Sequence, residues 1–265
     1  MTATRGETEP FDLDGGCSAT DPSVGVVCVH GFTGTPYDMR FLGGELARAG
    51  YHVHGLRLPG HNTTVEDLDE QRWSDWADAV EDAFDAMRLS CSHVAVVGLS
   101  LGGLLSLHLA AKRPEVAAVA SLAAPLWLEG MSARVAAWAA SGALTRLAPI
   151  MRAIPKIGGS DIRDPVVKAK GYGYPAIPVR ALAQLVQFMQ LVEGELDQVK
   201  QPVLVVHAEQ DHTAPVACAK RIAERTHAVR TRILPRSYHV IANDVERDIV
   251  AAEVIQFLRR HIPAA

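Results

Sequence analysis

A serine lies between two glycines at the end of an apolar run. Residues 94–103 read VAVVGLSLGG, so Ser100 is flanked by Gly98 and Gly102. A G-x-S-x-G pattern alone is weak evidence, because it arises by chance in roughly one chain of this length in ten. Its setting is more specific, since an apolar strand-like run precedes it and a leucine-rich helical run follows. That setting favours a nucleophilic serine on a sharp strand-to-helix turn, with a helix-capping serine as the simpler alternative.

A serine hydroxyl needs a base, and the base needs an acid that orients it. On a serine turn of this kind, the acid and then the histidine follow the serine along the chain, each just after a strand. The run RILPRSYHV places His239 after the last expected strand, and PVLVVHAEQDHTAP places Asp211 four residues beyond the end of its strand. Glu209 is a nearby competitor, but it lies closer to the strand end. We therefore predict a triad of Ser100, Asp211 and His239.

Each partner residue also has a simpler interpretation. Asp211 could start the helix expected near Pro215, and His239 could be a surface loop residue. Asp244 opens the last helical pattern, and we expect it to be the N-cap of that helix. The order and the strand-end positions of all three candidate residues together favour the triad.

Acyl transfer also requires N–H donors for a developing oxyanion. The loop after the first core strand reads VHGFTGTP, and its glycines allow the main chain to approach the serine closely. We expect the backbone N–H of Phe32 to be the first donor and that of Leu101 the second. His30 is expected to be a structural hydrogen-bonding residue because the strand end buries it, and His61, in RLPGHN, is given the same structural interpretation.

Other chemistries find less support in the sequence. No Asp or Glu replaces Ser100, which disfavours the alkyl-enzyme chemistry of dehalogenases and epoxide hydrolases. No His or Cys cluster has the spacing of zinc ligands, and we expect neither a metal nor a cofactor.

The elements that must position these residues alternate along the chain. Strands are predicted at residues 24–30, 51–56, 93–98, 116–122, 202–207 and 229–234. Several of these runs are continuously apolar, as in parallel strands that are covered on both faces. Helices are predicted from Pro36 to Gly50, over 73–87, from Ser100, near Pro215 and over 244–260. The alternation predicts an α/β fold with a mainly parallel, doubly wound sheet.

The alternation lapses between Pro125 and Lys200. This stretch has no clear strand, but two helical segments are predicted, near 131–147 and 178–192, with a Gly- and Pro-rich loop between them. We interpret the stretch as an insertion over the carboxyl edge of the sheet, within one domain.

Composition limits the possible partners and locations. The chain of 265 residues is 48% hydrophobic and 21% charged, with a formal net charge of −4, which gives no electrostatic reason to expect nucleic acid. The first sixteen residues lack the apolar core of a secretory signal, and no apolar run reaches the ~18 residues of a membrane span. The four cysteines are scattered, which is typical of thiols in a reducing cytoplasm. We expect a cytoplasmic protein without stable membrane insertion; the sequence gives no indication of its oligomeric state.

The pattern as a whole resembles the α/β-hydrolase fold and, within it, the bacterial carboxylesterases and monoacylglycerol lipases. The segments that carry the resemblance are VHGFTGTPYDMRFLGGELARAGY, LRLPGH, WSDWADAVEDA, GLSLGG, GSDIRDPVVK, HAEQDHTAP and RSYHV. The resemblance implies Ser100 as nucleophile, Asp211 as acid and His239 as base, with Phe32 and Leu101 forming the oxyanion hole.

The resemblance also implies a helical cap at residues 126–193 inside a single domain of residues 1–265. Two positions depart from the family: Leu101 stands where relatives often have methionine, and Ala169 stands where lipases that hold glycerol are expected to carry glutamate. The cap is rich in apolar residues. Most of them are expected to pack the cap on the sheet, and a few to line the path of an acyl chain. The candidates for substrate contact are Trp127, Met131, Ile157 and Phe188.

These observations predict a serine hydrolase for carboxylic esters of short to medium acyl chains, with monoacylglycerols among the candidate substrates. A thioester hydrolase or a carbon–carbon bond hydrolase would use the same triad with a different pocket. A non-catalytic ligand receptor could share the fold, although the three triad residues and both oxyanion positions are intact.

Overall fold

The computed structural model of this protein describes residues 5–15, 24–128, 153–156 and 158–262. Within these residues the centre of the fold is a seven-stranded sheet with the order β1-β3-β2-β4-β5-β8-β9, in which the edge strand β1 alone is antiparallel to its neighbour. The strands are β1 (Phe11–Leu13), β2 (Val24–Val29), β3 (His52–Gly55), β4 (His93–Leu99), β5 (Val116–Leu122), β8 (Val203–Ala208) and β9 (Arg230–Leu234). The predicted mainly parallel sheet is confirmed.

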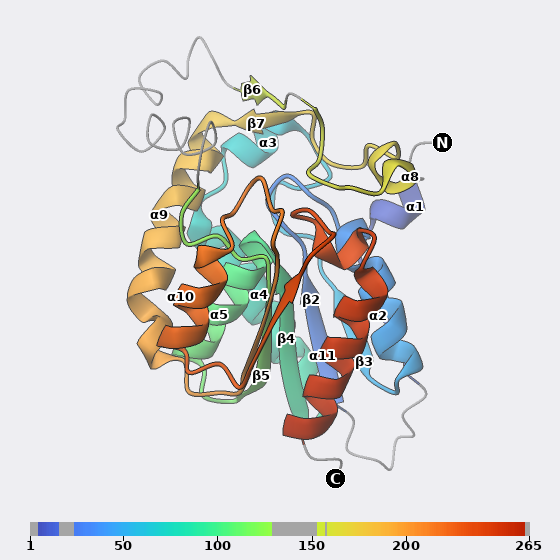
Figure 1. The fold of residues 1–265 in the computed structure, drawn as a ribbon, viewed down its shortest axis with the longest axis vertical. Coiled ribbons are helices and arrows are strands. Elements are labelled where there is room, and N and C mark those ends of the chain that lie inside the picture. The colour runs from blue at the N-terminus through green and yellow to red at the C-terminus, as the bar shows by residue number, and fades with distance from the viewer. Residues whose placement is uncertain (1–4, 16–23, 129–152, 157, 263–265) are drawn as a thin grey trace.

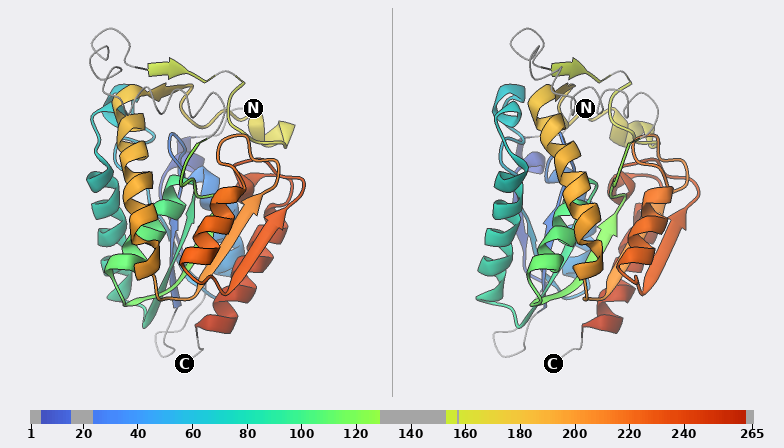
Figure 2. Two further views of the ribbon diagram at one scale, coloured as in Figure 1. Left: turned by 60° about the vertical axis from the view of Figure 1, so that its left-hand side comes forward. Right: turned by 90° about the vertical axis from the view of Figure 1, so that its left-hand side faces the viewer.

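Helices cover both faces of this sheet (Figures 1 and 2). The longer helices are α2 (Tyr37–Arg48), α4 (Trp73–Arg88), α5 (Leu101–Lys112), α9 (Val179–Glu195), α10 (Ala217–Arg225) and α11 (Arg247–His261). One hydrophobic core joins the sheet to α4, α5, α9 and α10, and a second joins it to α2 and α11. The sheet is therefore the middle of three layers.

Short elements complete the description of the chain. They are α1 (Arg5–Thr8), α3 (Val65–Asp69), α8 (Pro165–Lys168), the 3₁₀ helices η1 (Leu196–Gln198) and η2 (Ile241–Asn243), and the strands β6 (Ala153–Pro155) and β7 (Ala176–Pro178). None of the described helices is both long and apolar enough to cross a membrane.

Hydrophobic patterning explains how the elements pack. In β4, every residue from Val94 to Leu99 is buried, as expected for a central parallel strand with helices on both faces. Helix α4 buries Trp76, Val80, Phe84 and Met87 at three- and four-residue spacing. Its remaining positions are largely acidic or small, so this helix presents one apolar stripe to the core.

Strands β6 and β7 correct the expectation that residues 125–200 contain no strand. They pair antiparallel, with Ile154 opposite Ile177. Each has only three residues and includes a proline, so neither shows the alternation by which a strand is recognised. Helix α9 confirms the helical segment expected near 178–192, whereas the one expected near 131–147 lies outside the described residues.

The carboxyl ends of the parallel strands share one edge of the sheet, because parallel strands point the same way. The loops after β2, β4, β8 and β9 therefore meet at this edge. The segment that contains β6, α8 and β7, drawn yellow in Figures 1 and 2, lies beyond the same edge. Hydrogen bonds from Tyr174 N–H to the Thr33 carbonyl and from Val240 N–H to the Asp161 carbonyl connect this segment to the loops.

Candidate active site

Ser100 lies on a sharp turn between β4 and α5. Its φ of 55° and ψ of −114° are strained for any residue other than glycine. The turn is fixed by a hydrogen bond of 2.8 Å from Ser100 N–H to the Leu122 carbonyl on the neighbouring strand. A strained backbone maintained by its neighbours is typical of a functional position.

The glycines around Ser100 allow close contact between backbones. A Cβ on Gly98 would overlap the Gly102 carbonyl, and a Cβ on Gly102 would overlap the Val29 carbonyl. A Cβ on Gly103 would lie 2.9 Å from the Cβ of Ala124. The glycine pattern that drew attention in the sequence is thus required by the packing of the turn against β2 and β5.

The structure brings Ser100, His239 and Asp211 together from three loops. Ser100 Oγ lies 2.9 Å from His239 Nε2, and His239 Nδ1 lies 2.7 Å from Asp211 Oδ2. Ser100 is 9% exposed and His239 is 8% exposed, so both residues are largely shielded from solvent. This geometry allows a proton to pass from the serine to the imidazole.

Asp211 is held as an acceptor by groups on its own loop. Its Oδ1 accepts hydrogen bonds from the N–H groups of Thr213 and Ala214 at 2.8 and 2.7 Å. His207 Nε2 lies 3.3 Å from Oδ2. Burial alone would raise the pKa of Asp211, but the charge of His239 and the hydrogen bonds from His207 and His239 hold it well below the usual range. The carboxylate therefore stays ionised, while the competitor Glu209 is exposed.

The contact between Asp211 and His239 lowers the pKa of the carboxylate and raises that of the imidazole. Burial lowers the pKa of the imidazole, yet the charge of Asp211 and its hydrogen bond raise it above the ordinary histidine value. Asp161 and Asp38 add to the rise from farther away. Because Asp211 stabilises the imidazolium form, His239 is suited to take up a proton during a reaction.

Two buried carboxylates hold the loop that carries His239. Asp244 is 1% exposed and accepts hydrogen bonds from the N–H groups of Arg163, Asp164, Tyr238 and Val245. Glu246 Oε2 accepts from the N–H groups of Arg236 and Ser237 and from the Ser237 hydroxyl.

The expectation that Asp244 caps the last helix is therefore wrong. Glu246 occupies the N-cap position of α11, and the Asp244 side chain is already engaged by donors from other segments. Nothing in the sequence singles out Glu246, because an acidic residue just before a helix is ordinarily explained by the favourable charge at the helix start.

The two predicted oxyanion donors belong to Leu101, which follows Ser100 in the chain, and to Phe32, which follows a residue close to Ser100. Leu101 is the first residue of α5, where a backbone N–H has no acceptor within the helix. A Cβ on Gly31 would lie 3.3 Å from the Ser100 Cβ, so the loop after β2 passes directly over the serine. The Phe32 ring, next in the chain, packs edge-on against His61 and Trp76.

His30 and His61 have the structural roles predicted for them. Both side chains are fully buried. His30 Nε2 accepts the N–H of Leu58 at 3.1 Å, and His61 Nε2 accepts the N–H of Thr33 at 3.2 Å. Burial lowers the pKa of His30 to about 4 and that of His61 well below its usual value, so both imidazoles stay neutral.

The structure describes two of the four residues predicted to contact substrate and places them in different surroundings. Trp127 is partly buried in the loop that follows β5, packed against the core of α4, α5 and α9. Phe188 is fully buried and stacks on Trp73, with ring centroids 5.4 Å apart, which accounts for its side chain as packing between α9 and α4. Met131 and Ile157 lie outside the described residues. Substrate contact stays a prediction for all four.

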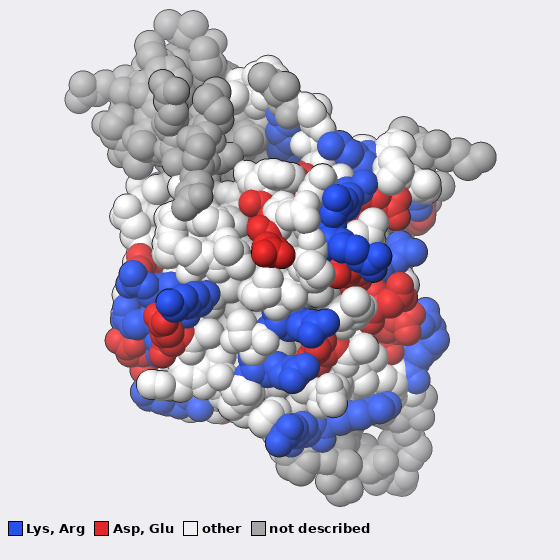
Figure 3. Space-filling model, viewed as in Figure 1, with Lys and Arg blue, Asp and Glu red and all other residues white. Residues whose placement is uncertain are grey.

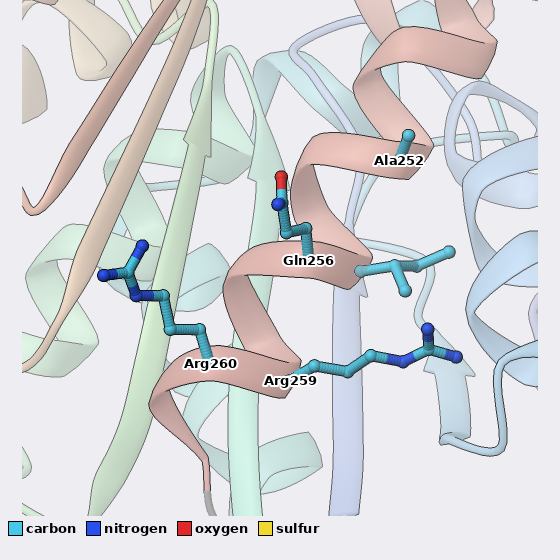
Figure 4. A pocket seen from close by; sticks show the side chains of 5 residues that line it. Ala252, Gln256, Arg259 and Arg260 are labelled. Atoms are coloured by element: carbon cyan, nitrogen blue, oxygen red, sulfur yellow. The ribbon is translucent and has the colours of Figure 1, made fainter.

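The surface away from Ser100 presents weaker candidates for a functional site. A shallow hollow on α11 is lined by Ala252, Ile255, Gln256, Arg259 and Arg260 (Figure 4), and none of these side chains is a nucleophile or an acid. On the face in Figure 3, basic and acidic residues lie interspersed over the described part of the chain. Among the described residues, no group of three or more His, Cys, Asp or Glu side chains could hold a metal ion.

Comparisons with known proteins show what this chain is similar to. The family model described as serine aminopeptidase, S33, matches residues 20–246. A thermostable monoacylglycerol lipase of Bacillus sp. (strain H-257) is 32% identical over 255 residues, which cover 96% of this chain and 95% of the relative. A carboxylesterase of Bacillus subtilis (strain 168) is 28% identical over 95% of this chain and 96% of its own.

Solved structures extend the likeness to three dimensions. A structure reported for the metagenome-derived lipolytic enzymes LipS and LipT has a TM-score of 0.84 and 31% identity, covering 96% of this chain and 98% of that one. A monoglyceride lipase from Saccharomyces cerevisiae has a TM-score of 0.77 at 15% identity, covering 96% and 91% of the two chains, which is a likeness of fold alone.

Proposed function

This chain belongs to the serine aminopeptidase S33 family and has the α/β-hydrolase fold, and on that premise we propose that it cleaves esters of short to medium acyl chains through an acyl-enzyme on Ser100. The protein is a carboxylic ester hydrolase. The catalytic residues, the acyl-enzyme mechanism and the acyl-chain length are our proposal. The observation that carries it is the hydrogen-bonded series from Ser100 through His239 to Asp211.

In the first half of the reaction, Ser100 Oγ attacks the ester carbonyl while His239 Nε2 takes up the hydroxyl proton. Asp211 keeps the Nδ1 proton of His239 facing it and stabilises the imidazolium. The carbonyl oxygen becomes an oxyanion, which the N–H groups of Phe32 and Leu101 stabilise. As the tetrahedral intermediate collapses, the alcohol leaves with the proton from His239, and the acyl group stays on Ser100.

In the second half, water replaces the alcohol. His239 takes a proton from the water, the hydroxide attacks the acyl carbon, and a second oxyanion forms beside the same two N–H groups. The acid leaves as Ser100 regains its proton from His239. Charge develops at the same atoms in both halves, so one preorganised site serves both.

We propose further that residues 126–193 form a cap within a single domain of residues 1–265 and that an acyl chain passes beneath it. The contacts of Tyr174 with Thr33 and of Asp161 with His212 support a cap docked on the loops that carry the site. The names of the bacterial relatives make monoacylglycerols a candidate substrate. A reducing, cytoplasmic location is also a proposal, supported by the burial of Cys28, Cys91 and Cys218 in the core.

The experiment is covalent labelling followed by turnover. A fluorophosphonate should label Ser100, and Ser100→Ala should lose p-nitrophenyl ester hydrolysis by roughly 10⁴–10⁶-fold while keeping its unfolding temperature. The matched control is Ser121→Ala, since Ser121 is buried close to the same turn and its hydroxyl has no hydrogen-bond partner among the described residues. That variant should keep wild-type rates.

Three outcomes would contradict the proposal. Labelling at another serine would displace Ser100 as nucleophile. An intact protein that takes up the label but turns over only thioesters or carbon–carbon substrates would change the reaction. A protein that binds esters without either labelling or turnover would be a receptor.

A further inference from the structure

Thr33, in the loop beside Ser100, has a backbone conformation that needs support from elsewhere. Its φ is 61°, a value that is unusual for a β-branched side chain. The strain falls on the residue next to Phe32, whose N–H is the first proposed oxyanion donor. Strain of this kind persists only where surrounding contacts compensate for it.

Those contacts come largely from the cap. Tyr174 N–H donates to the Thr33 carbonyl at 3.0 Å, and Lys156 Nζ donates to Thr33 Oγ1. Thr33 Oγ1 in turn donates to the Phe32 carbonyl at 2.5 Å. Lys156 follows β6 and is tied to the same segment by a bond of 2.8 Å from its N–H to the Pro175 carbonyl. A continuous series of hydrogen bonds thus leads from the cap to Phe32.

Residues outside the cap also hold the turn at Thr33. His61 Nε2 accepts the Thr33 N–H, and Asp38, on α2, accepts the Thr35 N–H at 3.3 Å. The Lys156 ammonium is part-buried, and Asp38 is the carboxylate that attracts it. The neutral His61 also faces it. The side chain therefore lies in a partly buried polar site.

We propose that Lys156 is a positioning residue for the oxyanion hole: through Thr33 it fixes the peptide that follows Phe32, so the hole is complete only while the cap segment is docked. This inference rests on the proposed function of Ser100 and of the Phe32 N–H. It makes the cap part of the machinery for charge stabilisation as well as a cover for the acyl chain.

Two other roles for Lys156 make different predictions. An ion pair with Asp38 that only fastens the cap would change stability and leave the turnover number of the folded enzyme alone. A direct contact with substrate would make the effect depend on the acyl chain or the alcohol. A positioning role lowers the rate of every ester by a similar factor, because the oxyanion is common to all of them.

The test compares Lys156→Met with Lys168→Met, an exposed lysine of α8 in the same cap segment. We expect Lys156→Met to lower kcat about 10- to 100-fold, less than the complete loss of one donor, and to change KM less than about twofold. The factor should be the same for butyrate and octanoate esters, and Lys168→Met should match the wild type. Inhibition by an alkyl trifluoromethyl ketone, whose adduct with Ser100 carries the oxyanion, should weaken by a similar factor.

Variants of Thr33 provide a second test that does not require the Lys156→Met protein to fold well. Thr33→Val removes the hydroxyl and keeps the branched shape, and it should reproduce the loss of kcat. Thr33→Ser should restore the rate to within a few fold. The double variant Lys156→Met/Thr33→Val should be no slower than either single variant, since both interrupt one series of contacts.

The pH profile is a further readout. Burial lowers the pKa of Lys156 to about 8, while the charge of Asp38 raises it. In the wild type, kcat should therefore fall as pH rises through about 8, because the neutral amine is a weaker donor to Thr33. Lys156→Met should lack this basic limb.

The outcomes separate this inference from the proposed function. If the wild type is labelled at Ser100 and Lys156→Met turns over at the wild-type rate, the positioning role is wrong and the function stands. A loss that varies with the acyl chain or the alcohol also overturns the positioning role, in favour of substrate contact. If the wild type is not labelled at Ser100, the proposed function itself fails.

Discussion

Asp244 Oδ2 accepts a hydrogen bond of 2.8 Å from the backbone N–H of Tyr238, the residue immediately before His239. The other oxygen of Asp244 accepts from Asp164 and Val245 at 2.8 Å each, and Arg163 N–H lies within reach of both oxygens. One carboxylate thus joins the loop that carries His239 to the segment that contains β6, α8 and β7.

Replacing the carboxylate of Asp244 by an amide should reduce stability more than the same change at its neighbour Glu246. In Asp244→Asn, an NH₂ group must face N–H donors, because both oxygens are in use. We expect the free energy of unfolding to fall by about 2–3 kcal/mol and kcat to fall about tenfold or more through displacement of His239. Glu246→Gln should lose only about 1 kcal/mol, since its three hydrogen bonds all go to Oε2 and an amide oxygen can replace it.

Urea unfolding and ester hydrolysis measure both variants. Equal losses in the two variants would show that the charge at these positions matters more than the number of oxygens engaged.

The dependence of activity on pH follows from the contact between His239 and Asp211. His239 must be neutral to accept the serine proton, and Asp211 raises its pKa above the ordinary value of ~6.5. kcat/KM should therefore rise with pH through an apparent pKa above that value. Asp211→Asn removes the main cause of the rise, so its residual activity should have an acid limb at lower pH. A profile between pH 5 and 8 that is flat in the wild type would exclude a histidine base.

The raised pKa of His239 also makes stability depend on pH, with a trend opposite to that of activity. Because the folded-state pKa of His239 is raised, its contribution to stability is complete below the unfolded pKa of ~6.5 and is lost as pH rises through the folded value. Activity should thus increase over the pH range in which this contribution declines. Unfolding measured across the same range, with His239→Gln as the reference, isolates the effect.

Gly102, at the turn, should tolerate substitution by alanine far less well than Gly194. Gly102→Ala would force a Cβ into the Val29 carbonyl, and we expect a loss of about 3 kcal/mol or more together with the loss of activity. Gly194→Ala is the control, since that glycine lies in helix α9 with no atom within 4 Å of a Cβ. It should stabilise the protein by about 0.5–1 kcal/mol through helix propensity. A well-folded, active Gly102→Ala enzyme would show that the turn is looser than its contacts indicate.

The sequence alone was enough to predict Ser100 and Asp211 at strand ends, because β4 and β8 are apolar runs that are almost wholly buried. Strand β9 is mostly exposed, so His239 was predicted only from its place after the last expected strand. The central strands were predictable for the same reason, to within two residues at their ends. The contacts that Lys156, Asp161 and Asp244 make with distant segments could not be predicted in this way. Their partners lie 123, 51 and 81 residues away, and such contacts leave no periodic pattern in the sequence.

Acyl-chain selectivity is the remaining prediction, and it depends on the cap. An apolar path beneath residues 126–193 would exclude water, and each methylene buried there is worth ~0.8 kcal/mol, or about three- to fourfold in kcat/KM. Selectivity should rise from acetate to a medium-chain optimum and then fall once the chain outgrows the path. The gain requires that the chain be held as well in the transition state as when bound.

Two aromatic residues separate chain binding from packing. Trp127 is partly exposed in the loop that follows β5, so Trp127→Ala should flatten the rise with chain length and leave the acetate rate within about twofold. Phe188 is buried against Trp73, so Phe188→Leu should lower stability by about 1 kcal/mol and change all esters equally. The measurement is kcat/KM for p-nitrophenyl esters from acetate to palmitate, with monoacylglycerols of the same chains alongside. A wild-type enzyme that is fastest on acetate and declines steadily thereafter would show that the cap does not bind the acyl chain, because buried methylenes would then contribute nothing to the transition state.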